Sequence, residues 1–130
     1  MKNDFGYNLR GIACNEYVAV CIGPEGKAKV FGDYPNYQEF AFFIQSNCLN
    51  TGAIETCSAN TPLTWNYGGQ ALKVYKVPGT MEGTNYFDVN VWESAIGSGG
   101  TWENWAIVNG SLNVTNSVAP ICALNNSNFE

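Results

Sequence analysis

The segment 85–115 constrains the fold most, because it joins alternating side chains to the strongest hairpin signal in the chain. Apolar residues alternate with other residues from Phe87 to Val91, as they do in a strand with one buried face. The dipeptide Asn109-Gly110 favours a type I′ turn, because both central residues of that turn have a positive φ. We expect a three-stranded antiparallel meander whose strands are 85–92, 102–108 and 111–115.

Two further hairpins are predicted upstream of this segment. A turn at 23–26, with Pro24 at its second position, separates strands at 16–22 and 27–31. A two-residue turn at Gly68-Gly69 separates strands at 63–67 and 70–77.

The segment 37–47 fits two structures. One helical face would carry Tyr37, Phe40, Phe43 and Ile44, whereas one strand face would carry Phe40, Phe42 and Ile44. The surrounding strands favour a strand.

The composition agrees with a chain made of strands and turns. Charged residues are only 13% of the sequence, against about 25% in an average globular protein. Seventeen Asn and fourteen Gly favour turns and a neutral surface, and the aromatic residues favour strands. We therefore expect residues 1–130 to form one all-β domain. Its predicted fold is an antiparallel β-sandwich, Greek-key or jelly-roll-like, with about seven or eight short strands and little or no helix.

The charges are unevenly distributed along the chain. Six basic and six acidic residues cancel before Val77, and five acidic residues without a base follow it, which gives the net charge of −5. A phosphate backbone or an anionic membrane would be repelled by the second part. We expect neither nucleic acid nor membrane as a partner.

The five cysteines are an odd number, and the chain has no histidine. We expect the thiols to be reduced and buried, with a Cys48–Cys57 disulfide as the alternative. Without histidine or a CxxC pair we predict no metal site and no cofactor. The cysteines are Cys14, Cys21, Cys48, Cys57 and Cys122.

The absence of histidine also argues against most hydrolytic sites, because it excludes the usual nucleophile–base pairs. A pair of carboxylates, Asp88 and Glu103 on neighbouring strands, would be the remaining way to carry out acid–base chemistry. The non-catalytic alternative is that both residues are solvated acids on the outside of a sheet. The loop Gly97–Gly100 has no following Lys with which to hold a phosphate. We predict that the chain is not an enzyme.

Four aromatic residues are the candidate binding residues. Two of them, Tyr86 and Trp92, would share a face of one strand, while Trp102 and Trp105 would lie on opposite faces of the next. They would form a platform for a sugar or a protein partner, or else they would fill the core and pack across strands. The four candidates are Tyr86, Trp92, Trp102 and Trp105.

We expect no secretory leader before the first strand, since Asp4, Arg10 and Glu16 interrupt every apolar run. Synthesis in the cytoplasm together with a neutral, β-rich composition is typical of virion proteins. The leading hypothesis is a phage capsid decoration or cement protein, or a tail or fibre protein, which assembles in the host cytoplasm through contacts with its own copies or with other subunits. If Met1 replaces a removed signal peptide, the alternative is a secreted carbohydrate-binding or lectin-like module.

Overall fold

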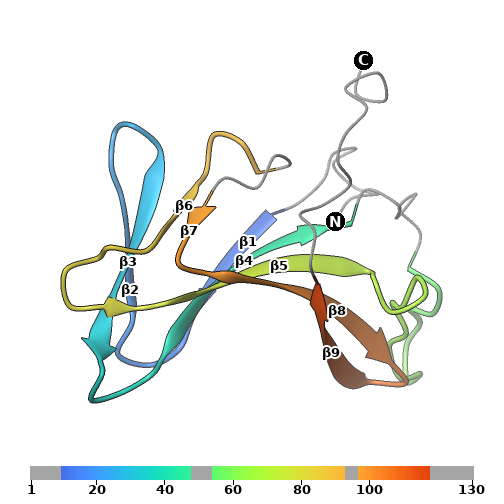
Figure 1. Cartoon of the computed structure of the whole chain (residues 1–130). Helices are drawn as coiled ribbons and strands as arrows, with labels where there is room; N and C mark the ends of the chain where they lie inside the picture. The colour runs from blue at the N-terminus through green and yellow to red at the C-terminus, as the bar shows by residue number, and fades with distance from the viewer. Residues whose placement is uncertain (1–9, 48–53, 93–96, 118–130) are drawn as a thin grey trace.

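The chain folds into two antiparallel sheets packed as a sandwich (Figure 1). The computed structural model describes residues 10–47, 54–92 and 97–117, and these contain nine strands and no helix. The all-β sandwich that the sequence predicts is confirmed, with nine strands in place of seven or eight. The strands are β1 (Arg10–Cys14), β2 (Ala19–Ile22), β3 (Lys27–Tyr34), β4 (Phe40–Ser46), β5 (Leu72–Pro78), β6 (Tyr86–Asp88), β7 (Gly97–Ser98), β8 (Thr101–Val108) and β9 (Ser111–Ser117).

The larger sheet has the strand order β1-β4-β5-β8-β9, and the smaller has β2-β3-β6-β7. Figure 1 shows β2 and β3 at one end of the molecule and the β8–β9 hairpin at the other. The larger sheet curves beneath the smaller one and continues beyond it to β9.

Two of the predicted hairpins are confirmed. Strand β8 pairs with β9 from Val108↔Ser111, and φ is 49° at Asn109 and 80° at Gly110, as a type I′ turn requires. Strand β2 pairs with β3, and the Gly26 N–H donates to the Gly23 carbonyl at 2.9 Å across the turn. Both turns need backbone conformations that few residues adopt, and Gly26, Asn109 and Gly110 can adopt them.

The prediction of a three-stranded meander is wrong for its first strand. Strand β6 pairs with β3 and β7 in the smaller sheet, so it never reaches β8. The extended segment ends at Asp88, whose carboxylate accepts the Asn90 N–H at 2.9 Å and starts a turn. Alternation identified the strand but not its neighbour, and Gly99 and Gly100 carry the chain from the smaller sheet to the larger.

The prediction of a hairpin at Gly68-Gly69 is also wrong. Strand β5 already has β4 on one side and β8 on the other, which leaves no edge for 63–67. That segment instead makes two isolated bridges, Thr56↔Thr64 and Trp65↔Ile107. The two glycines have positive φ in a turn where the Gly69 N–H donates to the Asn66 carbonyl.

The ambiguous segment 37–47 contains a strand, as the β-rich context indicates. Strand β4 pairs with both β1 and β5, and it buries alternate residues from Ala41 to Gln45 against the smaller sheet. Phe40, Phe42 and Ile44 lie on its opposite face, half-buried. Both faces of β4 are therefore apolar, which is why the helical pattern fitted equally well.

Four of the eight buried residues in the core cluster between the sheets are aromatic. The Phe43 ring from the larger sheet stacks on the Phe87 ring from the smaller at a centroid distance of 4.6 Å. The Trp92 ring lies 5.0 Å from that of Phe87, and the Tyr75 ring lies 4.8 Å from that of Trp102. Such ring pairs add to the free energy gained by burying their apolar area.

Candidate functional site

The structure separates the four predicted binding residues. Trp92 is only 6% exposed and belongs to the core, and Trp102 packs against the same core. Tyr86 lies on the smaller sheet, where the Lys27 Nζ is 4.9 Å from its ring centroid. Trp105 alone lies on the outer side of the larger sheet, so the four rings form no common platform.

Tyr86 and Trp92 do not share a strand face, contrary to the prediction, because β6 ends at Asp88. The prediction that Trp102 and Trp105 lie on opposite faces is confirmed. Trp102 contacts the core rings, whereas Trp105 packs at 5.5 Å against Phe42 on the other side of the sheet.

The outer side of the larger sheet carries a second apolar surface. Its members are the residues of β4, β5, β8 and β9 that alternate with those facing the core, and the register brings them side by side. Val74 on this side is fully buried, because neighbouring side chains cover it. We call this surface the apolar face, made of Phe40, Phe42, Ile44, Val74, Trp105, Ile107, Leu112 and Val114.

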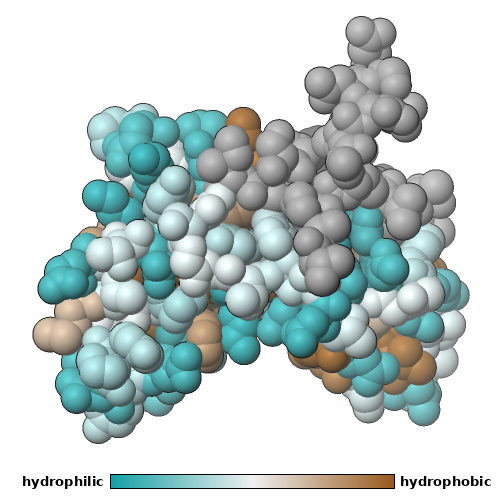
Figure 2. All heavy atoms as spheres, viewed as in Figure 1, coloured by the Kyte–Doolittle hydropathy of each residue, from teal (hydrophilic) through white to brown (hydrophobic). Residues whose placement is uncertain are grey.

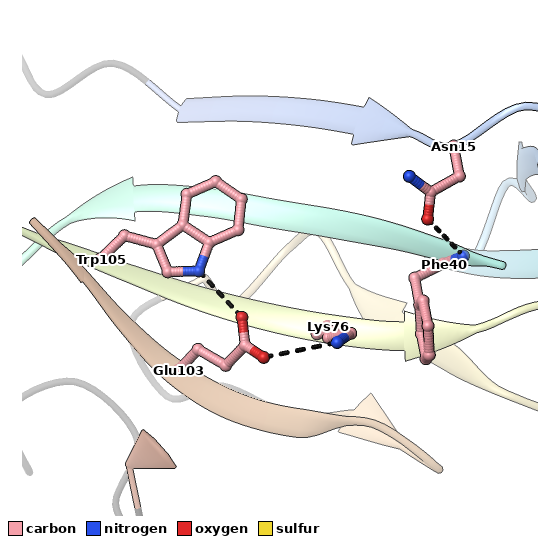
Figure 3. A network of polar contacts seen from close by, with 5 residues as sticks. All are labelled: Asn15, Phe40, Lys76, Glu103 and Trp105. Atoms are coloured by element: carbon pink, nitrogen blue, oxygen red, sulfur yellow. Dashed lines mark hydrogen bonds and ion pairs between the residues drawn. The ribbon is translucent and has the colours of Figure 1, made fainter. Parts of the chain in front are cut away.

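A line of polar contacts crosses the apolar face (Figure 3). The Trp105 Nε1–H donates to the Glu103 Oε2 at 2.8 Å, and the Glu103 Oε1 lies 3.6 Å from the Lys76 Nζ. The Lys76 Nζ in turn lies 4.2 Å from the centroid of the Phe40 ring, a cation–π contact. The single carboxylate and the single ammonium neutralise each other, so this surface has no net charge among the described residues.

A hydrogen bond that is not part of this line of contacts holds the start of β4. Asn15 Oδ1 accepts the Phe40 backbone N–H at 2.9 Å, which fixes Phe40 at the edge of the apolar face (Figure 3).

Leu112 and Val114 are the most exposed members of the apolar face, at 53% and 48%. Figure 2 shows hydrophobic atoms gathered at the lower right, where Figure 1 places the β8–β9 hairpin. Trp65 lies beside Ile107, with backbone hydrogen bonds of 2.8 and 2.9 Å joining the two residues. Its indole Nε1 is buried without a partner among the described residues, so it is the backbone pairing with Ile107 that ties Trp65 to β8.

The predicted Asp88–Glu103 carboxylate pair does not form. Asp88 lies in the smaller sheet and Glu103 in the larger, so they are not on neighbouring strands. Glu103 is buried under Trp105 and is already paired with Lys76. Among the described residues, no three His, Cys, Asp or Glu side chains come together in a group suited to a metal ion.

A cleft that the sequence did not predict lies near the loops that precede β2 and β4. Tyr17, Asp33 and Tyr37 line its volume of about 320 Å³. The Tyr17 and Tyr37 ring centroids are 6.3 Å apart with planes inclined by 29°, and the residues are 74% and 60% exposed. Tyr17 has a φ of 61°, an uncommon value for a bulky residue.

Asp33 is fixed at the base of this loop. Its carbonyl accepts the Tyr37 N–H at 3.0 Å, and its Oδ1 accepts the Asn36 amide at 3.1 Å. The half-buried Asp33 carboxylate thus uses Oδ1 for Asn36, which leaves Oδ2 as its other acceptor at the cleft. No sequence pattern singled out Tyr17, Asp33 and Tyr37 as a site, because Asp33 lies near the end of β3 and the two tyrosines come from separate loops.

In the part of the chain that the structure describes, three groups outside these surfaces have shifted pKa values. Burial lowers the pKa of Lys73, whose Nζ donates to Asn104 Oδ1 at 3.2 Å and to Ser117 Oγ at 2.5 Å. Burial raises the pKa of Tyr75, although a hydrogen bond from the Gly100 N–H partly opposes the shift.

The N–H groups of Tyr67 and Asn66 donate to the exposed Glu55 carboxylate and lower its pKa. None of the three shifted groups lies in the cleft or on the apolar face, so the shifts concern local structure.

The expectation of buried cysteines is wrong for three of the five. Cys14, Cys21 and Cys57 are exposed free thiols. Cys14 lies in β1 and Cys21 in β2, and each of these strands is at the edge of its sheet, where less of the chain covers it. Cys57 is free, so the alternative disulfide is not formed, and Cys48 and Cys122 lie outside the described residues.

The described part of the chain contains no helix able to span a bilayer. The apolar face and the tyrosine cleft are the two candidate functional surfaces. Comparisons with protein-family models, with curated proteins and with solved structures find no match for this chain.

Proposed function

We propose that this protein is a non-enzymatic structural module that acts through contacts with other protein subunits. The apolar face carries this proposal. It combines aromatic and aliphatic side chains with an internally neutralised ion pair, and exposed apolar patches of this kind mark interaction sites. Interface cores are likewise enriched in aromatic residues and poor in unpaired charge.

A virion is the assembly that best fits the rest of the molecule. The few charges and many amide and hydroxyl side chains suit a protein that is assembled in a cell and then faces the medium. In this proposal the chain decorates or cements a phage capsid, or belongs to the tail or fibre. Its partners are its own copies or neighbouring capsid or tail subunits, and no cofactor is needed.

The first test follows the chain into particles. When it is produced with a tag in the cells that carry its gene, the chain is expected to sediment with capsid-sized particles in a density gradient. Ile107→Lys places a charge on the apolar face and is expected to reduce incorporation at least tenfold, the effect of about 1.4 kcal/mol of lost binding free energy. Quantitative immunoblotting of the gradient fractions measures both.

Ile22→Lys is the matched control, because Ile22 is an exposed isoleucine on the edge strand β2 of the other sheet. This variant is expected to enter particles as the unmodified chain does. Far-UV circular dichroism checks that both variants are folded. A wild-type chain that stays with the unassembled proteins at the top of the gradient contradicts the proposal.

The tyrosine cleft favours a second candidate, a secreted carbohydrate-binding or lectin-like module. Two exposed rings provide flat apolar surfaces for a pyranose, and Oδ2 of Asp33 accepts a hydrogen bond from a sugar hydroxyl. In this candidate the sugar contacts Tyr17 and Tyr37 in place of the four aromatic residues predicted from the sequence.

A glycan array, followed by calorimetry on any hit, tests this candidate. Tyr37→Ala is expected to raise the Kd about tenfold, which corresponds to losing a contact worth about 1.4 kcal/mol. Tyr37→Phe keeps the ring face and is expected to bind nearly as well as the unmodified chain. An array without hits, or a Tyr37→Ala variant that binds unchanged, counts against the cleft.

A further inference from the structure

Among the described residues, no strand pairs with the second edge of β9, and this edge lacks the usual protection. Within the described residues β9 pairs only with β8, on one side. Its seven residues, SLNVTNS, include no charge and no proline. Natural edge strands are commonly protected by lysine, proline, a bulge or very short length, because an open edge can pair with another chain.

The register shows which backbone groups point to the open edge. The backbone N–H and carbonyl of Ile107 both hydrogen-bond to the backbone of Trp65. Ile107 therefore shares no backbone hydrogen bonds with Leu112, which lies opposite it on β9. Bonded and non-bonded pairs alternate along an antiparallel ladder. Leu112, Val114 and Asn116 therefore direct their N–H and carbonyl groups away from β8, toward the open edge.

These three residues are placed symmetrically about Val114, the middle residue of β9. If two copies of β9 run antiparallel with Val114 opposite Val114, then Leu112 of each copy lies opposite Asn116 of the other. All three outward-pointing residues then belong to bonded pairs, each of which exchanges two N–H···O bonds. If the two strands were centred on any other residue, at least one of these three residues would lie outside a bonded pair.

The side chains match in the same register. Ser111 meets Ser117, and Asn113 meets Thr115, pairs that can hydrogen-bond across strands. Val114 meets its own copy on the outer side of the sheet, beside Leu112, so the apolar faces of the two molecules become continuous. The absence of charge on β9 means that the pairing brings no like charges directly opposite each other.

We propose that β9 pairs antiparallel with β9 of a second copy of this chain, centred on Val114, so that two five-stranded sheets become one. The proposal deepens the proposed function, on which it rests, by naming one partner subunit as the chain itself. Isologous pairing of this kind closes on itself and gives a dimer with two-fold symmetry.

Sedimentation velocity on the full chain tests the pairing. The wild type is expected to form a species of twice the 14.2 kDa chain mass as its concentration rises. Val114→Pro removes an N–H that the β8 ladder does not use, and proline is tolerated on an edge strand. This variant is expected to lose the dimer, whereas Val114→Thr, which keeps the N–H and the branched side chain, retains it.

Amide hydrogen exchange on the wild type gives a readout that needs no variant. In the dimer, the amides of Leu112, Val114 and Asn116 are expected to be protected in proportion to the dimer fraction. The amides of Asn113 and Thr115 bond to β8 and are expected to be protected in the monomer too. This measurement decides the question even if Val114→Pro fails to fold.

Two results overturn the pairing. One is a wild type that remains monomeric at high concentration, and the other is a dimer in which Leu112, Val114 and Asn116 still exchange rapidly. A monomeric chain that nevertheless sediments with particles overturns only this inference and leaves the proposed function standing. A chain that dimerises through β9 but never enters particles contradicts the proposed function and leaves the β9 pairing standing.

Discussion

Phe87→Ala is expected to lower the free energy of unfolding by about 3–5 kcal/mol, the usual cost of truncating a buried phenylalanine. The Phe87 ring is fully buried and lies 4.6 Å from the ring of Phe43 and 5.0 Å from that of Trp92. Its removal leaves a cavity between the two sheets and breaks the stack that joins them. Urea unfolding followed by tryptophan fluorescence measures the change, because Trp92 reports directly on this site.

Phe42→Ala is the matched control on the opposite side of the larger sheet. Phe42 is half-buried and contacts Trp105 at 5.5 Å, so its loss is expected to cost only about 1–2 kcal/mol. Equal losses for the two variants would contradict the placement of the core between the sheets.

Gly79→Ala is expected to destabilise the fold by about 2–4 kcal/mol, because it forces backbone apart rather than a mobile side chain. A Cβ at this position would lie 2.9 Å from the Phe31 carbonyl oxygen and 3.0 Å from both the Cα and the N of Gly32. Strand β3 in the smaller sheet and the end of β5 in the larger approach each other here. Urea or thermal unfolding of the variant measures the cost.

Gly11→Ala provides the comparison. A Cβ at Gly11 would meet only the Ile44 Cβ, at 3.9 Å, which is an ordinary contact. That substitution is expected to change the stability by no more than about 0.5 kcal/mol. A Gly79→Ala variant as stable as Gly11→Ala would show that the sheets do not meet at this point.

The features that the sequence predicted correctly depend on local chemistry. Asn109-Gly110 and the turn ending at Gly26 need backbone conformations that few residues adopt, so they could be placed from the sequence alone. The all-β class followed from alternation and composition in the same way. Strand β4 was recognised from its strand-rich context rather than from its own pattern.

Strand partners and site residues depend on distant parts of the chain and could not be predicted in this way. The pattern of 85–92 does not show that β3, rather than β8, is its neighbour. The pairing of Glu103 with Lys76, from β5, is likewise a product of the register. Tyr17 and Tyr37 are 20 positions apart in the sequence and meet because β1 pairs with β4 and β2 with β3.

The route of the chain between the sheets has a consequence for folding. Strand β1 lies in the larger sheet, β2 and β3 in the smaller, β4 and β5 in the larger, β6 and β7 in the smaller, and β8 and β9 in the larger again. The smaller sheet can be completed only after β4 and β5 of the larger sheet have been made, and the larger sheet only after β7 has completed the smaller one. During synthesis the edge of β5 that β8 will occupy therefore stays open until nearly the whole described chain has emerged, and an open strand edge of this kind can pair with another chain.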